Sequence, residues 1–197
     1  MEMQFSTKLS EGHYLIFLFC VSCSFSTSKI EYERGQNFLE KKDFKSAFDA
    51  FKKVYDLEGD SELGLKAAKE TARIAHFEAH QYKEAATIYE KLLLGQRNEA
   101  ERLVTLRTLA DLYFIQLADY KSAIETYNTL LSLPHSKEDT YLFQLNIAKS
   151  YFYMNNFFQA DIELEKLINQ NADSGQMVEP LLLKANIYLT SKELDQA

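Results

Sequence analysis

The sequence predicts an all-α fold in which antiparallel helix pairs stack as an α-solenoid. Helix-breaking residues are scarce, since the 197 residues include only two Pro and six Gly, and this scarcity favours helix. Hydrophobic residues make up 46% of the chain, which is enough for a packed core and argues against disorder. Apolar residues also recur at spacings of three and four, as one face of a helix requires.

This spacing occurs in four similar segments. Each has an aromatic residue, Ala three residues later, an aromatic residue or Leu four after that, and an aliphatic residue three further on. The four sets are Phe44/Ala47/Phe51/Val54, Tyr82/Ala85/Tyr89/Leu92, Tyr120/Ala123/Tyr127/Leu130 and Phe157/Ala160/Leu164/Leu167. The intervals between the four Ala positions are 38, 38 and 37 residues. Another amphipathic stretch precedes each segment, so each repeat is predicted to be a first helix followed by a second helix.

Capping residues lie where these helices are expected to begin and end. The predicted N-caps are Asp43, Asp119 and Asn156 for second helices and Asn98 and Ser136 for first helices. The residues expected to follow second helices are Gly59, Gly95 and Pro134.

The pattern resembles the tetratricopeptide repeat (TPR), a helix–turn–helix unit of about 34 residues. The matching residues are Gly35, Phe38, Ala47 and Phe51 in the first unit and Ala148, Tyr151, Ala160 and Leu164 in the fourth. The chain lacks the first-helix Trp of that pattern. Its longer period suggests added residues in the first helices of units two and three, as in longer-helix relatives such as TPR-like lipoproteins of bacterial envelopes.

The resemblance implies a right-handed solenoid of about four and a half repeats. The predicted units cover residues 28–59, 60–96, 97–135, 136–172 and an incomplete 173–197. In the last of these, Ala185 and Tyr188 repeat the positions of Ala148 and Tyr151. We therefore expect either a truncated chain or a fifth unit that is completed by something else.

The segment 1–26 is predicted to be a signal peptide or a lipoprotein-type leader. Its apolar run, Tyr14 to Val21, is too short for a membrane span, which needs about 20 residues, but suits a secretory signal. Ser22 before Cys23 resembles a lipoprotein signal, so lipidation of Cys23 and a location in the cell envelope, periplasmic or lipid-anchored, are expected. The alternatives are a mispredicted start or a non-specific apolar leader, and the alternative location is cytoplasmic. Cys20 and Cys23 lack the further ligands that a zinc site needs.

The remaining residues predict no enzyme, cofactor, metal site or small-molecule substrate. The net charge of −7 argues against nucleic-acid binding, and no phosphate-binding loop or catalytic constellation occurs. His76 and His80 have the i, i+4 spacing of zinc-binding helices, but Glu78 is not where the zinc-protease motif needs it. Packing and turn roles are expected for the two histidines, and a metalloenzyme is the alternative.

The predicted function is a non-catalytic scaffold that binds protein or peptide partners. In TPR proteins the concave face, lined mainly by first helices, commonly binds peptide segments or partner helices, and aromatic, amide and basic side chains there could hold an extended peptide. The predicted partner-binding residues are Arg107, Asp111, Phe114, Asn146, Lys149, Phe152, Tyr153 and Asn186. Two alternatives remain: these residues pack against the adjacent repeat, or the repeats are the sensor or docking region of a larger enzyme or regulator that continues beyond Ala197.

Overall fold

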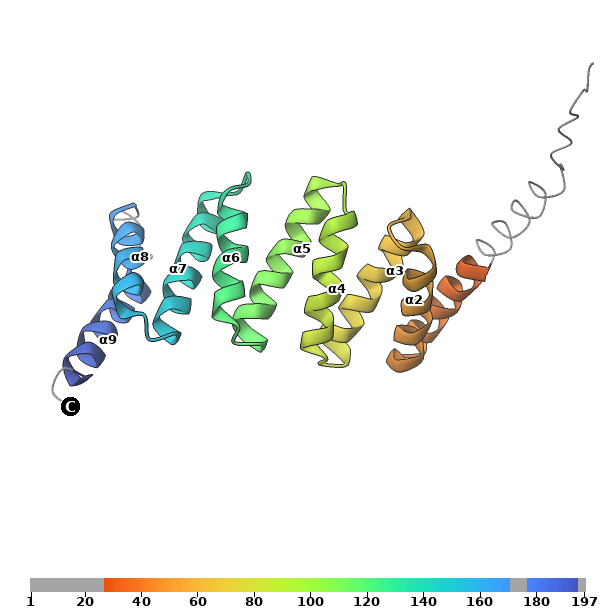
Figure 1. The fold of residues 1–197 in the computed structure, drawn as a ribbon, viewed down its shortest axis with the longest axis horizontal. Coiled ribbons are helices and arrows are strands. Elements are labelled where there is room, and N and C mark those ends of the chain that lie inside the picture. The colour runs from red at the N-terminus through yellow and green to blue at the C-terminus, as the bar shows by residue number, and fades with distance from the viewer. Residues whose placement is uncertain (1–26, 171–176, 195–197) are drawn as a thin grey trace, which may run out of the picture. The chain divides into compact units, whose positions relative to one another are not determined.

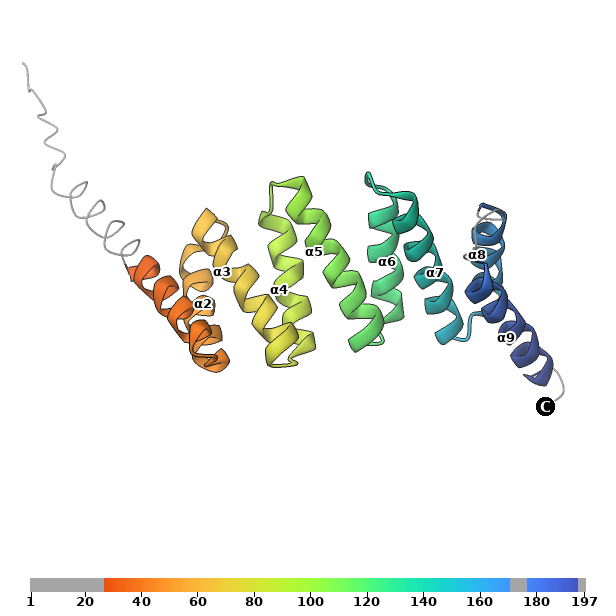
Figure 2. The same ribbon diagram turned by 180° about the vertical axis from the view of Figure 1, so that it is seen from behind.

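The computed structural model describes residues 27–170 and 177–194, whose helices are shown in Figures 1 and 2. Every regular element in these ranges is a helix, so the predicted all-α class is confirmed. The predicted leader lies outside the described residues. The chain divides into two compact units, Met1–Ala79 and His80–Ala197, which we call the N-terminal and C-terminal units.

The N-terminal unit contains a helix over residues 27–40, α2 (Phe44–Glu58), α3 (Glu62–Arg73) and a π-helical turn, η1 (Ile74–Glu78), that continues α3. Its core is built around Phe51, which is fully buried and meets the Tyr32 ring edge-on at a centroid distance of 5.2 Å. Ala47 and Val54 are buried on the same face of α2, as the repeat pattern predicted.

The C-terminal unit contains the second helix of one pair, two complete helix pairs and a further first helix. In chain order these are α4 (Tyr82–Gly95), α5 (Glu99–Asp111) with its π-helical turn η2 (Leu112–Gln116), α6 (Tyr120–Leu131), α7 (Lys137–Tyr153), α8 (Phe157–Gln170) and α9 (Val178–Leu194). Consecutive helices run antiparallel and pack against each other, as Figure 1 shows for α6, α7 and α8. None of the described helices in either unit is long and apolar enough to span a membrane.

The repeated Ala positions of the second helices are fully buried. Ala47, Ala85, Ala123 and Ala160 are all 0% exposed. A methyl group at this position lets the neighbouring helix approach closely, because helix axes separated by about 8–10 Å leave little room for larger side chains. The repeated Ala therefore lie in the core, on the helix face that the spacing predicts.

The predicted N-caps are confirmed by their hydrogen bonds. Asp43 and Asp119 each accept a hydrogen bond from the backbone N–H of the residue three positions later, at 3.1 and 3.2 Å. The other three predicted N-caps, Asn98, Ser136 and Asn156, likewise accept from backbone N–H groups. These bonds satisfy N–H groups that have no partner within the helix.

The turn between first and second helices has one conformation that recurs with the repeat. Lys42, His80, Ala118 and Asn155 have φ angles of 58°, 54°, 50° and 58°, in the left-handed region that non-glycine residues rarely adopt. After three of these residues, the next backbone N–H donates a hydrogen bond to a carbonyl oxygen of the first helix. In one example, the Asp119 N–H donates to the Tyr113 carbonyl oxygen at 2.9 Å. Each turn thus follows the closing geometry of a helix C-terminus.

The π-helical turns account for one added residue in the first helices of units two and three. The buried small residue of the first helix is seven positions before the left-handed residue in units one and four, but eight positions before it in units two and three. η1 and η2 lie within these longer intervals. A π-helical turn closes its hydrogen bonds one residue further along than an α-helical turn, so it accommodates the added residue.

Candidate partner-binding surface

The residues predicted to bind a partner all lie on first helices of the C-terminal unit. Arg107 and Asp111 are on α5, Phe114 is on η2, and Asn186 is on α9; the other four are on α7. No finding tests their role, which stays a prediction, but the structure shows what each side chain contacts.

Two of these residues are joined through a buried tyrosine. The Tyr127 hydroxyl on α6 donates to Asp111 Oδ1 at 2.8 Å and accepts from Asn146 Nδ2 at 3.0 Å. Tyr127 and Asn146 are buried. Burial is the main cause that raises the pKa of Tyr127, and the negative charge of Asp111 raises this pKa further. Asp111 and Asn146 therefore link α5, α6 and α7, and the Asn146 amide is used within the chain.

Two cations of the predicted set form ion pairs between first helices. Arg107 on α5 pairs with Asp139 on α7, and its guanidinium lies 5.2 Å from the centre of the Phe143 ring. Burial alone would raise the pKa of Asp139, but the hydrogen bond from Ser136 and the positive charge of Arg107 outweigh burial and lower this pKa. Lys149 on α7 pairs with Glu179 on α9 at 2.5 Å. These charges are neutralised within the chain.

The predicted aromatic residues form a cluster near the turns that join first and second helices. The Phe114 ring lies 6.0 Å from Tyr120 and 6.1 Å from Tyr153, and Tyr120 and Tyr153 are 5.1 Å apart between ring centres. Phe152 contacts both Tyr153 and Phe157. Phe114 and Phe152 are half-buried, whereas Tyr153 is 50% exposed and presents the accessible edge of the cluster.

Exposed hydrophobic residues recur at equivalent positions of α5–η2 and α7. Val104 and Leu142 are 64% and 44% exposed, and Ile115 and Tyr153 are 66% and 50% exposed. The two members of each pair are separated by one repeat of 38 residues. Of these four residues only Tyr153 was predicted to bind a partner, although the apolar residues at the same spacing are a signal in the sequence for the other three.

A cavity of about 440 Å³ lies beside Val104, between α5, the end of α6 and the start of α7. Leu103, Leu130, Pro134 and Phe143 give it an apolar lining, and Arg107, His135 and Asp139 supply polar groups at its edge. The arrangement can accept an apolar side chain with polar groups beside it, as expected of a small recognition pocket.

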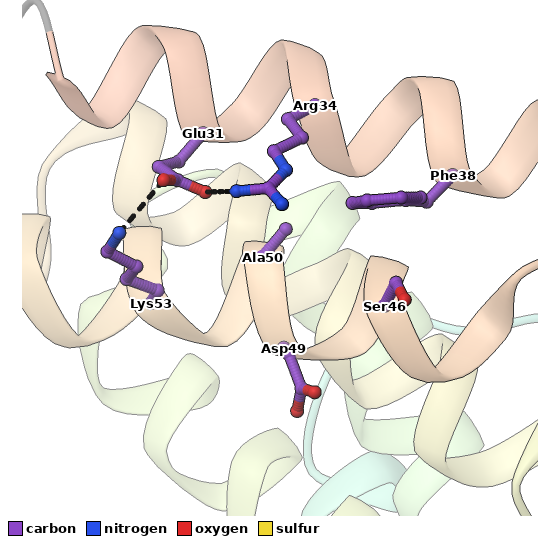
Figure 3. Close-up of a pocket in the computed structure, with 7 residues that line it drawn as sticks. All are labelled: Glu31, Arg34, Phe38, Ser46, Asp49, Ala50 and Lys53. Atoms are coloured by element: carbon purple, nitrogen blue, oxygen red, sulfur yellow. Dashed lines mark hydrogen bonds and ion pairs between the residues drawn. The ribbon is translucent and has the colours of Figure 1, made fainter.

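The N-terminal unit has a smaller cavity of about 240 Å³ between the helix over residues 27–40 and α2, drawn in Figure 3. Glu31 forms ion pairs with Lys53 at 2.8 Å and Arg34 at 3.8 Å. The Arg34 guanidinium lies 5.3 Å from the centre of the Phe38 ring. The cation–π contact and the shared carboxylate hold this cluster together.

The two histidines have the local environments expected from the repeat. His76 is buried in the N-terminal unit and stacks on Phe77 with a ring-centre distance of 4.0 Å. His80 is exposed in the C-terminal unit, where it is the left-handed turn residue and its Nδ1 lies 3.2 Å from the Tyr82 hydroxyl. Within the described ranges, no group of three or more His, Cys, Asp or Glu is arranged to hold a metal ion.

Comparisons with known proteins agree with the repeat architecture. The family model "Tetratricopeptide repeat" matches residues 143–174, which include most of α7 and all of α8. No curated protein sequence matches the chain.

Similar solved structures include a tetratricopeptide repeat protein from Parabacteroides merdae, with a TM-score of 0.56 and 22% identity over 86% of this chain. The chain spans 62% of the length of that protein. TPR-like repeats from Podospora anserina give a TM-score of 0.56 and 16% identity over 87% of this chain and 90% of the other. MamA from Desulfovibrio magneticus gives a TM-score of 0.53 and 11% identity over 86% of this chain and 95% of the other.

Identities of this size show the fold alone, and the fold agrees with the matched repeat and with the buried Ala pattern. The chain carries a tetratricopeptide repeat at residues 143–174 and has the α-solenoid fold of TPR proteins.

Proposed function

We propose that the chain is a non-catalytic scaffold that binds a peptide or helical segment of a protein partner on the first-helix face of α5, η2 and α7. The observation that carries this proposal is the repeat-matched exposure of Val104 with Leu142 and of Ile115 with Tyr153. Large hydrophobic side chains scattered singly over a surface need no explanation, but the same two helix positions are exposed and apolar in consecutive units. A partner lying across both helices would contact all four.

The charges on this face favour an apolar partner segment. Arg107 is paired with Asp139, and Lys149 with Glu179. Because both cations already have counter-ions, a charged peptide would have to replace existing ion pairs, and exposed pairs contribute little net energy in either arrangement. Affinity is therefore expected to come from apolar side chains buried against the four exposed residues, with the cavity beside Val104 receiving one of them.

The test compares partner capture by the native chain and by variants with an altered face. Leu142→Asp with Tyr153→Asp places two carboxylates on α7, and Leu94→Asp introduces the same charge at a second-helix position that is 88% exposed. Mass spectrometry after affinity capture measures the amount of each protein that the native chain enriches. This amount should be at least about tenfold lower with the double variant, which is equivalent to a loss of about 1.4 kcal/mol in binding free energy. The captured proteins should be retained with Leu94→Asp. Equal capture by all three folded chains would contradict the proposed face.

The proposal extends to an exported chain that is tethered at an envelope membrane through Cys23. Its support is the sequence of the leader, with an apolar run of signal-peptide length and Ser22 before Cys23. Metabolic labelling with a fatty-acid precursor should label the native chain but not Cys23→Ala, and Cys20→Ala is the matched control. Absence of label on the native chain would remove the anchor while leaving the partner-binding surface untouched.

A further inference from the structure

The turn between α7 and α8 carries large exposed apolar side chains and no charge. Tyr153 and Met154 are 50% and 46% exposed, and Phe158, the second residue of α8, is 78% exposed. Residues 150–160 include no Asp, Glu, Lys or Arg. The end of α7 and the start of α8 therefore present an uncharged, largely apolar surface to solvent.

This composition distinguishes the α7–α8 turn from the other turns between first and second helices. Counted from two residues before the left-handed residue to three after it, the four turns are residues 40–45, 78–83, 116–121 and 153–158. Each of the first three turns contains both an acidic residue and a lysine, and the fourth contains neither. The loss of charge is therefore a property of this one turn and does not belong to the repeat.

The exposure of Phe158 is a property of its repeat position. In the three earlier units an exposed lysine occupies the same position, namely Lys45, Lys83 and Lys121. A further first helix follows each of these lysines, as α9 follows Phe158. The repeat therefore leaves this position in solvent even where the next unit is present.

The turn is held in place by its own hydrogen bonds and by aromatic packing. The backbone N–H groups of Met154, Asn155 and Asn156 donate to carbonyl oxygens of α7 at 3.1, 2.9 and 2.9 Å. The half-buried rings of Phe152 and Phe157 pack against each other with 5.6 Å between their centres. Because these backbone N–H groups already have partners within the chain, they lose little when the turn leaves water.

The turn lies at an edge of the C-terminal unit where helices end, beside the turn that joins η2 and α6 (Figures 1 and 2). Ile115, which is 66% exposed, lies just before that neighbouring turn. Side chains at the ends of neighbouring helices can reach one flat surface together, whereas Val104 and Leu142 lie further along their helices. An exposed apolar patch at such an edge suits a membrane surface.

We propose that the α7–α8 turn inserts into the interfacial region of a lipid bilayer, between the headgroups and the acyl chains. Aromatic side chains are favoured there, because the ring leaves water while the tyrosine hydroxyl keeps polar contacts. A turn without charges loses no ionic hydration on insertion. Met154 and Phe158 lie outside the proposed partner-binding face, so the inference does not depend on the proposed function.

A single tryptophan tests the insertion directly, because the chain contains no Trp. Phe158→Trp in the full chain places the probe at the turn, and Leu94→Trp places it on α4 at a position that is 88% exposed. Each variant is mixed with phosphatidylcholine vesicles whose acyl chains are brominated and therefore quench a tryptophan that reaches them. The Phe158→Trp emission should shift to shorter wavelength and be quenched, whereas the Leu94→Trp emission should not change. Both variants carry the same leader, so binding by the leader alone would not separate them.

A pair of lysines tests the composition of the turn. Met154→Lys with Phe158→Lys places at the turn the residues that the first unit has as Lys41 and Lys45, so circular dichroism should show an unchanged fold. Co-sedimentation with phosphatidylcholine vesicles should weaken by at least about tenfold relative to the native chain. Leu94→Lys is the matched control and should sediment like the native chain.

Three results would overturn the proposal: no vesicle binding by the native chain, equal quenching at the two Trp positions, or equal co-sedimentation of the double-lysine variant. If the Phe158→Trp emission is unaffected by vesicles but shifts when a captured protein is added, the turn is a protein-docking surface and membrane insertion is refuted.

Discussion

The Tyr127 hydroxyl is a single group that joins three helices of the C-terminal unit, so its removal should be costly. Tyr127→Phe deletes the bond to the Asp111 carboxylate at 2.8 Å and the bond from Asn146 at 3.0 Å. A hydrogen bond to a charged group contributes about 1.5–3 kcal/mol and a neutral one about 0.5–1.5 kcal/mol. Because Asn146 is buried, its N–H would also lose its partner without gaining water. We therefore expect a loss of about 2–4 kcal/mol in the free energy of unfolding.

Urea unfolding followed by circular dichroism measures this loss, and hydrogen exchange of α5, α6 and α7 shows where it falls. Tyr120→Phe is the matched control, since Tyr120 lies on the same helix, is half-buried, and should lose less than about 0.5 kcal/mol. Adding Asn146→Leu to Tyr127→Phe should restore part of the loss, because removing both partners leaves no unsatisfied donor. A loss below about 0.5 kcal/mol for Tyr127→Phe alone would show that the network does not hold the three helices together.

Three further results are expected. Burial and Asp111 raise the pKa of Tyr127 above its ordinary value of 10.0, so on raising the pH the unfolded chain loses the Tyr127 proton before the folded chain does. The free energy of unfolding should therefore fall as the pH rises above 10.0, and it should fall less steeply in Tyr127→Phe. Equal slopes for the two chains in an alkaline titration would contradict this. Ala118→Gly should raise the midpoint temperature of thermal unfolding. Glycine removes the steric strain of the left-handed conformation, about 1–2 kcal/mol, and this gain exceeds the entropic cost of glycine, about 0.5–1 kcal/mol. A lowered midpoint would count against strain at this turn. Gly64→Ala should destabilise by about 1–3 kcal/mol in urea, because its Cβ would lie 2.1 Å from the Gly59 carbonyl oxygen; helix propensity alone predicts the opposite sign.

The fold was predictable because its determinants are local and repeated. The N-caps depend on hydrogen bonds between residues three apart, and the spacing of the four Ala and their apolar neighbours defines one face of a helix before any neighbouring helix is considered. Four samples of one pattern also correct each other, so a weak signal in any single helix matters less. A pattern shared by all repeats does not predict the side-chain contacts that occur in one repeat and not in the others.

The candidate surface was predictable only in part, because pairing partners come from other helices. Asp111 and Asn146 were predicted to face a ligand, yet both bond to Tyr127. The pattern predicts that the residue at position 127 is buried, since Phe51, Tyr89 and Leu164 occupy the same place. It does not predict what a hydroxyl there would contact. Arg107 and Lys149 are similar, since their counter-ions lie on the next first helix.

The pair Tyr151 and Tyr188 shows the limit of reading burial from a pattern. Both occupy one repeat position, but Tyr151 packs in the core that α8 completes, whereas Tyr188 is 67% exposed. The local sequence fixes the side of the helix on which each ring lies, and the neighbouring helix decides whether that side is buried. Burial at a repeat position therefore depends on the helix packed beside it as well as on the local pattern, which is why four copies of one pattern predict the buried face of a helix better than the burial of any one residue.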